Sequence, residues 1–285
     1  MRTVWGIAWN RQKLLRLSTG GADLLTRAQH RRRRSARSGP DRSRKPYQHE
    51  RGGARRNAMQ PKPPLWRDRT AAGRELAERW ADLKGRNDTL LIGLPRGGVA
   101  VAAAMADGLG LPLATWAVRK ITDPSWPEVA IGAVAPGGVV LWGDPEQATG
   151  LSHQQLAQLV RQQQAELLRR QSRYGDPDPR SLAGLHLVVV DDGIATGLTA
   201  RAALVSLRRL GPASLGLAVP VVDRRLVAEL EALVERLEIL AVVPHLQAVG
   251  PWYERFEQLD DSAVIKLLAR SGQLTGAGRR GGIES

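Results

Sequence analysis

The chain has 285 residues, of which 42% are hydrophobic, no cysteine, and a formal net charge of +14. This length and apolar content allow one α/β domain with a buried core. The lack of cysteine excludes disulfides, thiolate nucleophiles and cysteine metal sites, and no apolar run approaches the roughly 18 residues that a transmembrane helix needs. We therefore expect a cytoplasmic protein that does not associate with membranes.

The positive charge is concentrated at the N-terminus. Residues 1–58 hold 16 Lys+Arg and 3 Asp+Glu, whereas residues 59–285 hold 26 and 25. The first segment shows no sustained apolar period, so we expect it to be disordered. Three explanations stay open: a translation start at Met59, a basic arm that binds nucleic acid, or a transit peptide. The nearly neutral remainder is not expected to bind nucleic acid.

From residue 70 onward, helical and strand patterns alternate along the chain. The first half predicts a helix at 70–84, a strand at 89–94, a turn at 95–98, a helix at 99–107, a strand at 113–119, an irregular segment at 121–128 and a hairpin of 129–134 with 139–142. The second half predicts a long helix capped by Ser152, a strand at 187–190, helices at 199–210, 224–236 and 261–270, strands at 215–222 and 238–243, and an irregular aromatic stretch at 251–259. The alternation indicates an α/β fold, a mainly parallel central sheet with helices on both faces. We place this domain at 65–271 and a flexible tail at 272–285.

The most informative stretch is residues 187–199, where an apolar β-branched run ends in Asp191 and Asp192. A loop rich in glycine and hydroxyl groups follows, and a helical pattern then begins at Thr199. Carboxylates can bind sugar hydroxyls, while loop amides and a helix N-terminus can bind a phosphate. This arrangement fits a ribose 5-phosphate.

Two further segments follow predicted strands. Arg96, Gly97 and Gly98 form a turn whose glycines allow an anion to approach the backbone. Arg119 and Lys120 supply two cations suited to a diphosphate. Since ligands bind at the carboxyl ends of strands in open α/β sheets, we expect these segments and the paired acids to form one site.

Together these motifs resemble those of the type I phosphoribosyltransferases, which use phosphoribosyl diphosphate (PRPP). The resemblance covers most of 65–271 and is strongest at 93–134 and 187–205. It implies that Asp191 and Asp192 bind the ribose hydroxyls and, directly or through water, Mg²⁺. It further implies a phosphate-binding loop, a diphosphate loop at 96–98, and a mobile segment at 121–128 that closes over the site. The phosphate loop comprises Gly193, Ala195, Thr196, Gly197, Leu198 and Thr199.

Two departures from the family pattern are informative. Gly193 stands where the family usually has an aliphatic residue. Ala195 stands where the hypoxanthine–guanine branch has an acid that is its proposed general base, so a 6-oxopurine acceptor is disfavoured. The chain is most similar to an uncharacterised group with Asp-Asp-Gly-Ile-Ala-Thr-Gly.

The resemblance implies a Mg²⁺-dependent glycosyltransferase of nucleotide metabolism that acts on PRPP and an unidentified acceptor, with Asp191, Asp192, Arg119 and Lys120 as its catalytic residues. Family members commonly form homodimers, and a hood after the last strand often stacks an aromatic residue on the base. Trp252 and Tyr253 are candidates for that role, although core packing explains them equally well. The alternative function is a non-catalytic sensor of PRPP or nucleotides.

Overall fold

A computed structural model describes residues 62–143 and 150–271, which belong to one unit of the chain, Ala58–Ser285. The predictions made for residues 1–58 and 272–285 concern segments outside these described residues. The boundaries proposed for those segments therefore stay predictions.

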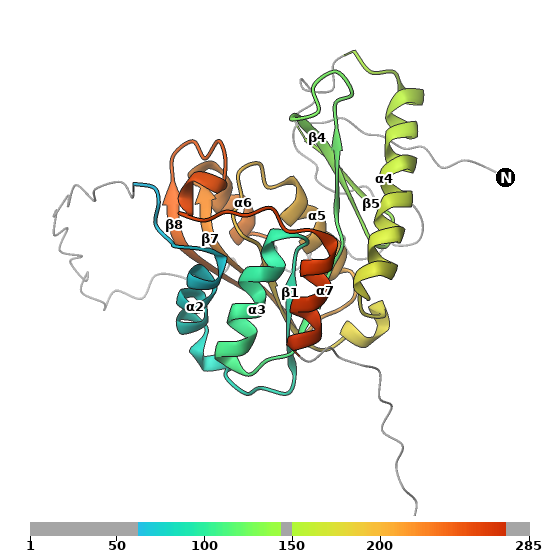
Figure 1. Ribbon diagram of the computed structural model, residues 1–285. Coiled ribbons are helices and arrows are strands. Elements are labelled where there is room, and N and C mark those ends of the chain that lie inside the picture. The colour runs from blue at the N-terminus through green and yellow to red at the C-terminus, as the bar shows by residue number, and fades with distance from the viewer. Residues whose placement is uncertain (1–61, 144–149, 272–285) are drawn as a thin grey trace, which may run out of the picture. The chain divides into compact units, whose positions relative to one another are not determined.

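The centre of the fold is a five-stranded parallel sheet with the strand order β2-β1-β6-β7-β8 (Figure 1). Its strands are β1 (Thr89–Gly93), β2 (Leu113–Thr115), β6 (His186–Val190), β7 (Ser214–Asp223) and β8 (Arg236–Val243). All five occur where the sequence predicts strands, although β2 is shorter than expected. The predicted α/β class with a mainly parallel sheet is confirmed.

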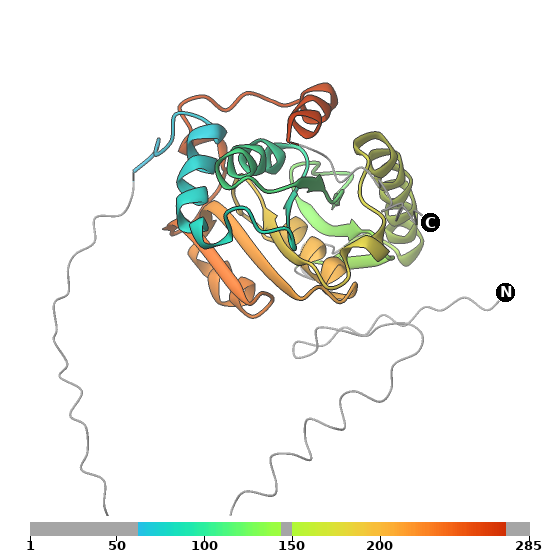
Figure 2. The same cartoon turned by 90° about the horizontal axis from the view of Figure 1, so that it is seen from below.

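Helices cover both faces of this sheet (Figure 2). Alternate residues of each strand point to opposite faces, and both sets of side chains are buried under helices. Leu90 and Ile92 pack into a core shared with α5 (Leu198–Arg208), whereas Leu91 packs against α2 (Arg69–Arg79) and α3 (Gly97–Leu109). The strands are apolar on both faces, as expected for a buried parallel sheet.

A second, three-stranded antiparallel sheet has the order β3-β4-β5. It consists of β3 (Arg119–Thr122), β4 (Ala130–Ala135) and β5 (Val139–Trp142), so the predicted hairpin is confirmed. The prediction of one strand over 113–119 is wrong, because β2 ends at Thr115 and β3 begins at Arg119. The carboxylate of Asp176 accepts hydrogen bonds from the Thr115 hydroxyl and the Ala117 amide, both at 2.7 Å, where the chain leaves the parallel sheet.

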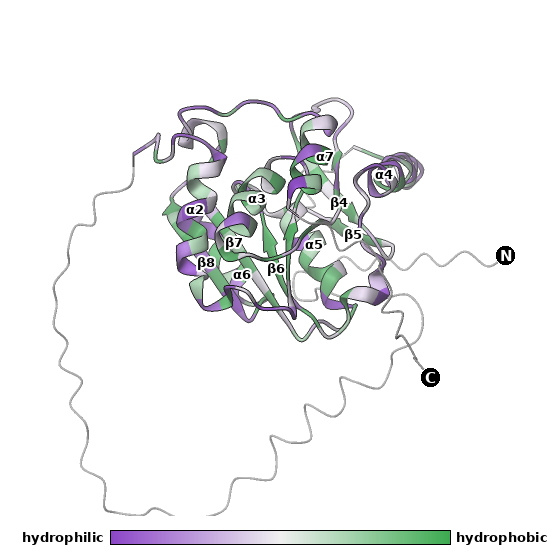
Figure 3. Cartoon of the chain, turned by 60° about the horizontal axis from the view of Figure 1, so that its bottom comes forward, coloured by the Kyte–Doolittle hydropathy of each residue, from purple (hydrophilic) through white to green (hydrophobic). Residues whose placement is uncertain are grey.

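The long helix α4 (His153–Tyr174) lies beside the small sheet. Ser152 caps its start, as the sequence predicts, and forms a capping box with Gln155, while Gly175 ends the helix in the left-handed conformation. Figure 3 shows this helix as largely hydrophilic, in contrast to the apolar strands of the main sheet.

The helix predicted at 224–236 is shorter in the structure. A 3₁₀ turn at Arg224–Leu226 leads into α6 (Val227–Glu231), and the Glu235 amide already donates to the Leu215 carbonyl at 2.9 Å. The helical spacing of apolar residues in the sequence therefore extends past the end of the helix, into residues that lead to β8. The remaining elements are 3₁₀ turns at Ala81–Leu83, Pro179–Leu182 and Gly250–Trp252, and the helix α7 (Asp261–Arg270).

Among the helices in the described ranges, none combines the length and apolarity needed to cross a bilayer.

Candidate active site

The candidate site lies where the connections of two neighbouring strands diverge. From β1 the chain passes through α3 to β2 on one side, and from β6 it passes through α5 to β7 on the other. Such a switch point is where open α/β sheets bind ligands. The β1–α3 turn and the acids after β6 therefore lie side by side, as the sequence predicts.

The contact between these two segments is close enough to require glycine. A Cβ atom at Gly97 would overlap Asp192 Oδ2, and one at Gly98 would lie 2.6 Å from the Val190 carbonyl oxygen. Both separations are shorter than any side chain tolerates. The glycines of the turn thus bring the amino end of α3 directly against the paired acids.

Arg69, the first residue of α2, is a site residue that the sequence analysis missed. Its Nε donates to Asp192 Oδ2 at 2.8 Å, its Nη1 donates to the Glu257 carbonyl at 2.8 Å, and its guanidinium lies 3.7 Å from the centre of the Phe256 ring. The side chains of Arg69 and Asp192 are only 11% and 15% exposed. The negative charge of Asp192 is thereby neutralised by a residue 123 positions away in the sequence. No sequence motif predicts this ion pair.

Replacing Arg69 with methionine is expected to destabilise the protein by about 2–4 kcal/mol, because it leaves the Asp192 charge unpaired in a partly buried position. It should also weaken, at neutral pH, the PRPP binding that the family resemblance implies, since Asp192 then ionises less readily. Chemical denaturation and calorimetry measure the two effects. Arg74→Met, on the exposed side of the same helix, is the control, and equal effects of the two substitutions would contradict the role of Arg69.

The two acids influence each other's ionisation. Burial raises the pKa of Asp191 well above its ordinary value, and the charge of Asp192 raises it further, whereas the hydrogen bond from the Asp192 amide (2.9 Å) and the charge of Lys120 oppose the rise. Burial also raises the pKa of Asp192, against the charge and hydrogen bond of Arg69. The pair therefore favours binding of a cation or of hydroxyl donors, which stabilise the ionised carboxylates.

Asp191→Asn is expected to raise the melting temperature at pH 8 and to change it less at pH 4.5. The folded-state pKa lies above the unfolded value of about 3.9, so the wild type loses stability as pH rises from that value through the folded pKa. Asparagine keeps an oxygen acceptor for the Asp192 amide and removes this pH-dependent loss. Thermal melts of both proteins across pH 4–8 measure it, and a difference that is constant with pH would contradict the assignment.

The phosphate loop predicted at 193–199 ends as the amino terminus of α5. Gly197 adopts a left-handed φ of 75° at the N-cap, and no side chain caps the amides that follow. Such uncapped amides are the usual ligands of a phosphate at a helix start. A Cβ at Gly193 would lie 2.6 Å from Val249 Cγ1 and 3.0 Å from Val221 Cγ1, so a larger residue would crowd both valines.

Asp223, at the end of β7, is a second residue that the sequence analysis missed. Its buried carboxylate accepts hydrogen bonds from the Leu246 amide at 2.9 Å and from the Arg225 side chain at 2.7 Å. The Arg225 hydrogen bond outweighs burial and holds the pKa of Asp223 at about 2. The backbone amide of Asp223 donates to the Ile194 carbonyl at 3.0 Å. Asp223 thus positions the segment after β8 next to the predicted phosphate loop.

The structure corrects the expectation that Arg119 and Lys120 both end a strand of the parallel sheet. They begin β3 in the small sheet, and neighbouring strand residues point to opposite faces. The Lys120 charge acts on both site carboxylates, whereas Arg119 Nε donates to Gln163 Oε1 of α4 at 3.2 Å. The two cations therefore occupy opposite faces of β3.

The structure separates the two aromatic candidates. Tyr253 is buried, its ring packs against Trp66 and Phe256, and its hydroxyl donates to the Asp192 carbonyl at 2.6 Å. The expectation that it stacks on an acceptor base is therefore corrected, because its ring is covered by protein. Trp252 is only half-buried and stays a candidate.

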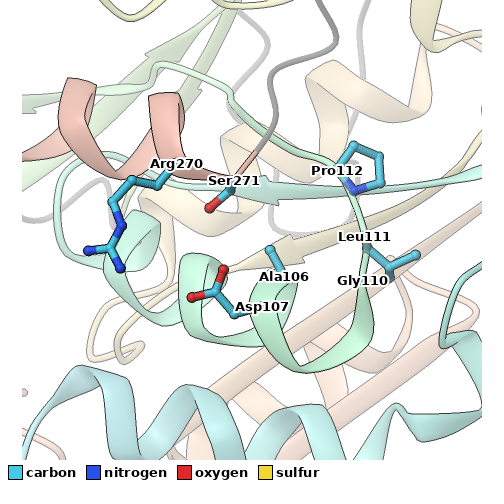
Figure 4. A pocket seen from close by; sticks show the side chains of 7 residues that line it. All are labelled: Ala106, Asp107, Gly110, Leu111, Pro112, Arg270 and Ser271. Carbon is cyan, nitrogen blue, oxygen red and sulfur yellow. The ribbon is translucent and has the colours of Figure 1, made fainter.

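A shallow cavity of about 390 Å³ lies elsewhere, between the α3–β2 turn and the end of α7 (Figure 4). Its lining includes Asp107, Pro112 and Arg270. It adjoins the amino end of β2, opposite to the strand ends at which the paired acids lie. The predicted site is thus not the cavity shown in Figure 4.

In the part of the chain that the structure describes, no group of three or more His, Cys, Asp or Glu residues could hold a metal ion. Asp191 and Asp192 provide two carboxylates, which are the oxygen ligands that Mg²⁺ prefers. Because Mg²⁺ keeps most of its waters and commonly binds through one or two carboxylates plus substrate phosphates, this donor set fits an ion that enters with its substrate.

Comparison with known proteins agrees with the geometry. The phosphoribosyl transferase domain family matches residues 66–245. Two proteins of Mycobacterium tuberculosis, from the strains CDC 1551 / Oshkosh and H37Rv, carry the provisional name phosphoribosyl transferase and are 40% identical over 209 residues, covering 73% of this chain. The matched region is 47% of each relative, so the chain spans about half their length.

The crystal structure of TT1426 from Thermus thermophilus is similar in fold, with a TM-score of 0.56 and 36% identity. The match covers 72% of this chain and 98% of that one. Since the matched residues 66–245 span the five-stranded parallel sheet and the paired acids at its switch point, the chain belongs to the phosphoribosyl transferase domain family.

Proposed function

We propose that this protein is a Mg²⁺-dependent phosphoribosyltransferase that uses PRPP as its ribose 5-phosphate donor. The observation that carries the proposal is the contact of the Gly97–Gly98 turn with Asp191 and Asp192. This contact joins a diphosphate-binding turn to a pair of carboxylates suited to ribose hydroxyls. The uncapped amides of α5 add a third subsite, for the 5-phosphate.

In this arrangement the protein positions PRPP and stabilises developing charge, and the acceptor supplies the nucleophile. Asp191 and Asp192 accept hydrogen bonds from the ribose hydroxyls. These bonds hold the anomeric carbon between the Gly97–Gly98 turn and the phosphate loop before α5. Lys120 and Arg96 stabilise negative charge on the departing diphosphate. When bound, Mg²⁺ neutralises part of the charge on the diphosphate and on the ribose oxygens.

The phosphate loop lacks a side chain that could act as a general base, and this limits the chemical class of the acceptor. Ala195 has no group that can accept a proton, so a base whose ring nitrogen must be deprotonated by a loop acid is disfavoured. An amine or a base that is already nucleophilic fits better. We therefore infer an acceptor other than a 6-oxopurine.

Turnover of PRPP with Mg²⁺ against a panel of bases and amines, with diphosphate release as the readout, tests the proposal. Diphosphate release that depends on one acceptor class would support it. Tight PRPP binding with no turnover across the panel would favour the sensor function instead. Failure to bind PRPP would contradict both functions.

Trp252→Ala is expected to raise the KM for an aromatic acceptor about 5- to 150-fold, since stacking on a base contributes ~1–3 kcal/mol. PRPP affinity should stay nearly unchanged, because other loops hold PRPP. Steady-state kinetics with each substrate varied in turn measure both constants. A loss of thermal stability with unchanged acceptor KM would place Trp252 in the core instead.

A further inference from the structure

Asp192 is held from two segments of the chain that are far apart in the sequence. The Tyr253 hydroxyl donates to the main-chain carbonyl of Asp192 at 2.6 Å, whereas Arg69 Nε donates to its carboxylate at 2.8 Å. One hydrogen bond therefore fixes the backbone of this acid, and a separate one fixes its side chain.

The segments that supply these two partners are paired with each other. Residues 65–67 and 252–255 are joined by backbone hydrogen bonds, among them one of 2.9 Å from the Glu254 amide to the Trp66 carbonyl. In Figure 1 the chain leaves the end of β8 after this strand and crosses toward α7. The pairing thus ties the stretch after β8 to the start of α2.

Packed aromatic rings connect the two partners of Asp192. The guanidinium of Arg69 lies 3.7 Å from the centre of the Phe256 ring, and that ring stacks on Tyr253 with a centroid distance of 5.2 Å. Trp66 contacts the Tyr253 ring as well, at a centroid distance of 5.6 Å. Tyr253 is only 4% exposed, so its hydroxyl is held in place by its surroundings on the ring.

The carbonyl that Tyr253 binds belongs to the peptide group joining the paired acids to the predicted phosphate loop. A peptide group is planar, so a bond that fixes its oxygen also fixes the direction of the next N–H, that of Gly193. Glycine restricts this junction little, because it has no Cβ. Burial and the charge of Asp192 raise the pKa of Tyr253, so the phenol keeps its proton and acts as a donor.

We propose that Tyr253 is a positioning residue, whose hydroxyl holds the Asp192–Gly193 peptide group and thereby orients the paired acids and the phosphate loop for ribose 5-phosphate. This inference rests on the proposed function, because it assigns the ribose and the 5-phosphate of PRPP to these two elements. The hydroxyl acts through Asp192 and does not touch the ligand. Diphosphate binding, which the proposed function assigns to the turn at 96–98, does not use this peptide group.

The test compares Tyr253→Phe with Tyr174→Phe. Each substitution removes one hydroxyl from a buried tyrosine whose hydrogen bond is 2.6 Å long, and the partner of Tyr174 is Asp261 of α7. Each is expected to lower the melting temperature by about 2–4 °C. Only Tyr253→Phe is expected to weaken ribose 5-phosphate binding with Mg²⁺, about 3- to 10-fold by calorimetry, with diphosphate affinity unchanged.

The ligand dependence separates positioning from packing. If Tyr253 only packs in the core, Tyr253→Phe melts earlier but binds ribose 5-phosphate as the wild type does, and this result overturns the inference. Equal weakening of ribose 5-phosphate and diphosphate would indicate a general loosening of the fold and would overturn it too. Both results leave the proposed function standing, whereas a wild type that binds neither ribose 5-phosphate nor PRPP contradicts that function and the inference with it.

Discussion

Replacing both Asp191 and Asp192 with asparagine is expected to weaken PRPP binding about a hundredfold or more. Hydrogen bonds to charged groups contribute ~1.5–3 kcal/mol each, and the double substitution removes the charge from two of them. Asparagine nearly preserves the size and shape of each side chain but removes the charge partner of Arg69, so a thermal melt establishes that the variant is folded. Calorimetry with PRPP and Mg²⁺ measures the affinity.

The matched control for this double variant removes two carboxylates elsewhere. Glu78→Gln with Asp107→Asn changes the net charge equally at two exposed positions, so it separates the local role of the acids from a general change in charge. A folded Asp191→Asn/Asp192→Asn protein that binds PRPP as tightly as the wild type would remove the paired acids from the site. Loss of binding in the control as well would show that total charge, rather than the acids, governs affinity.

Gly97→Ala is expected to reduce PRPP affinity about 10- to 100-fold, because the new methyl group would occupy the position of Asp192 Oδ2. The same Cβ would lie 3.1 Å from Arg69 Nε. The carboxylate must rotate away, which breaks its ion pair with Arg69 and misplaces it for the ribose. Calorimetry gives the affinity, and a thermal melt reports the loss of the ion pair.

Gly108→Ala lies near the other end of α3 and provides the comparison. Its Cβ would lie 3.1 Å from the Ala77 Cβ, a small overlap far along the helix from the acids. Both substitutions add one methyl group to the same helix, so the difference between them isolates the contact with Asp192. If Gly97→Ala binds PRPP like Gly108→Ala, the turn and the acids do not form one site.

The sequence by itself determined the local elements of this site. In residues 187–199 the apolar run, the two acids and the glycine-rich loop are contiguous, so a strand, its polar end and a helix start follow from neighbouring residues alone. The same holds for the capping box of Ser152 and Gln155, which depends only on residues three apart. Alternating helices and strands with apolar strand interiors were sufficient to predict the fold class.

Contacts between residues distant in sequence were decided only by the tertiary structure. Arg69 neutralises Asp192 across 123 residues, and Tyr253 is covered by Trp66, because the segments before α2 and after β8 meet beside the paired acids. The single strand predicted at 113–119 does not reveal that the chain divides there between two sheets, and this division sets the directions of Arg119 and Lys120. A side chain's neighbours depend on which strand carries it and which face it occupies, and packing fixes both only after the chain has folded.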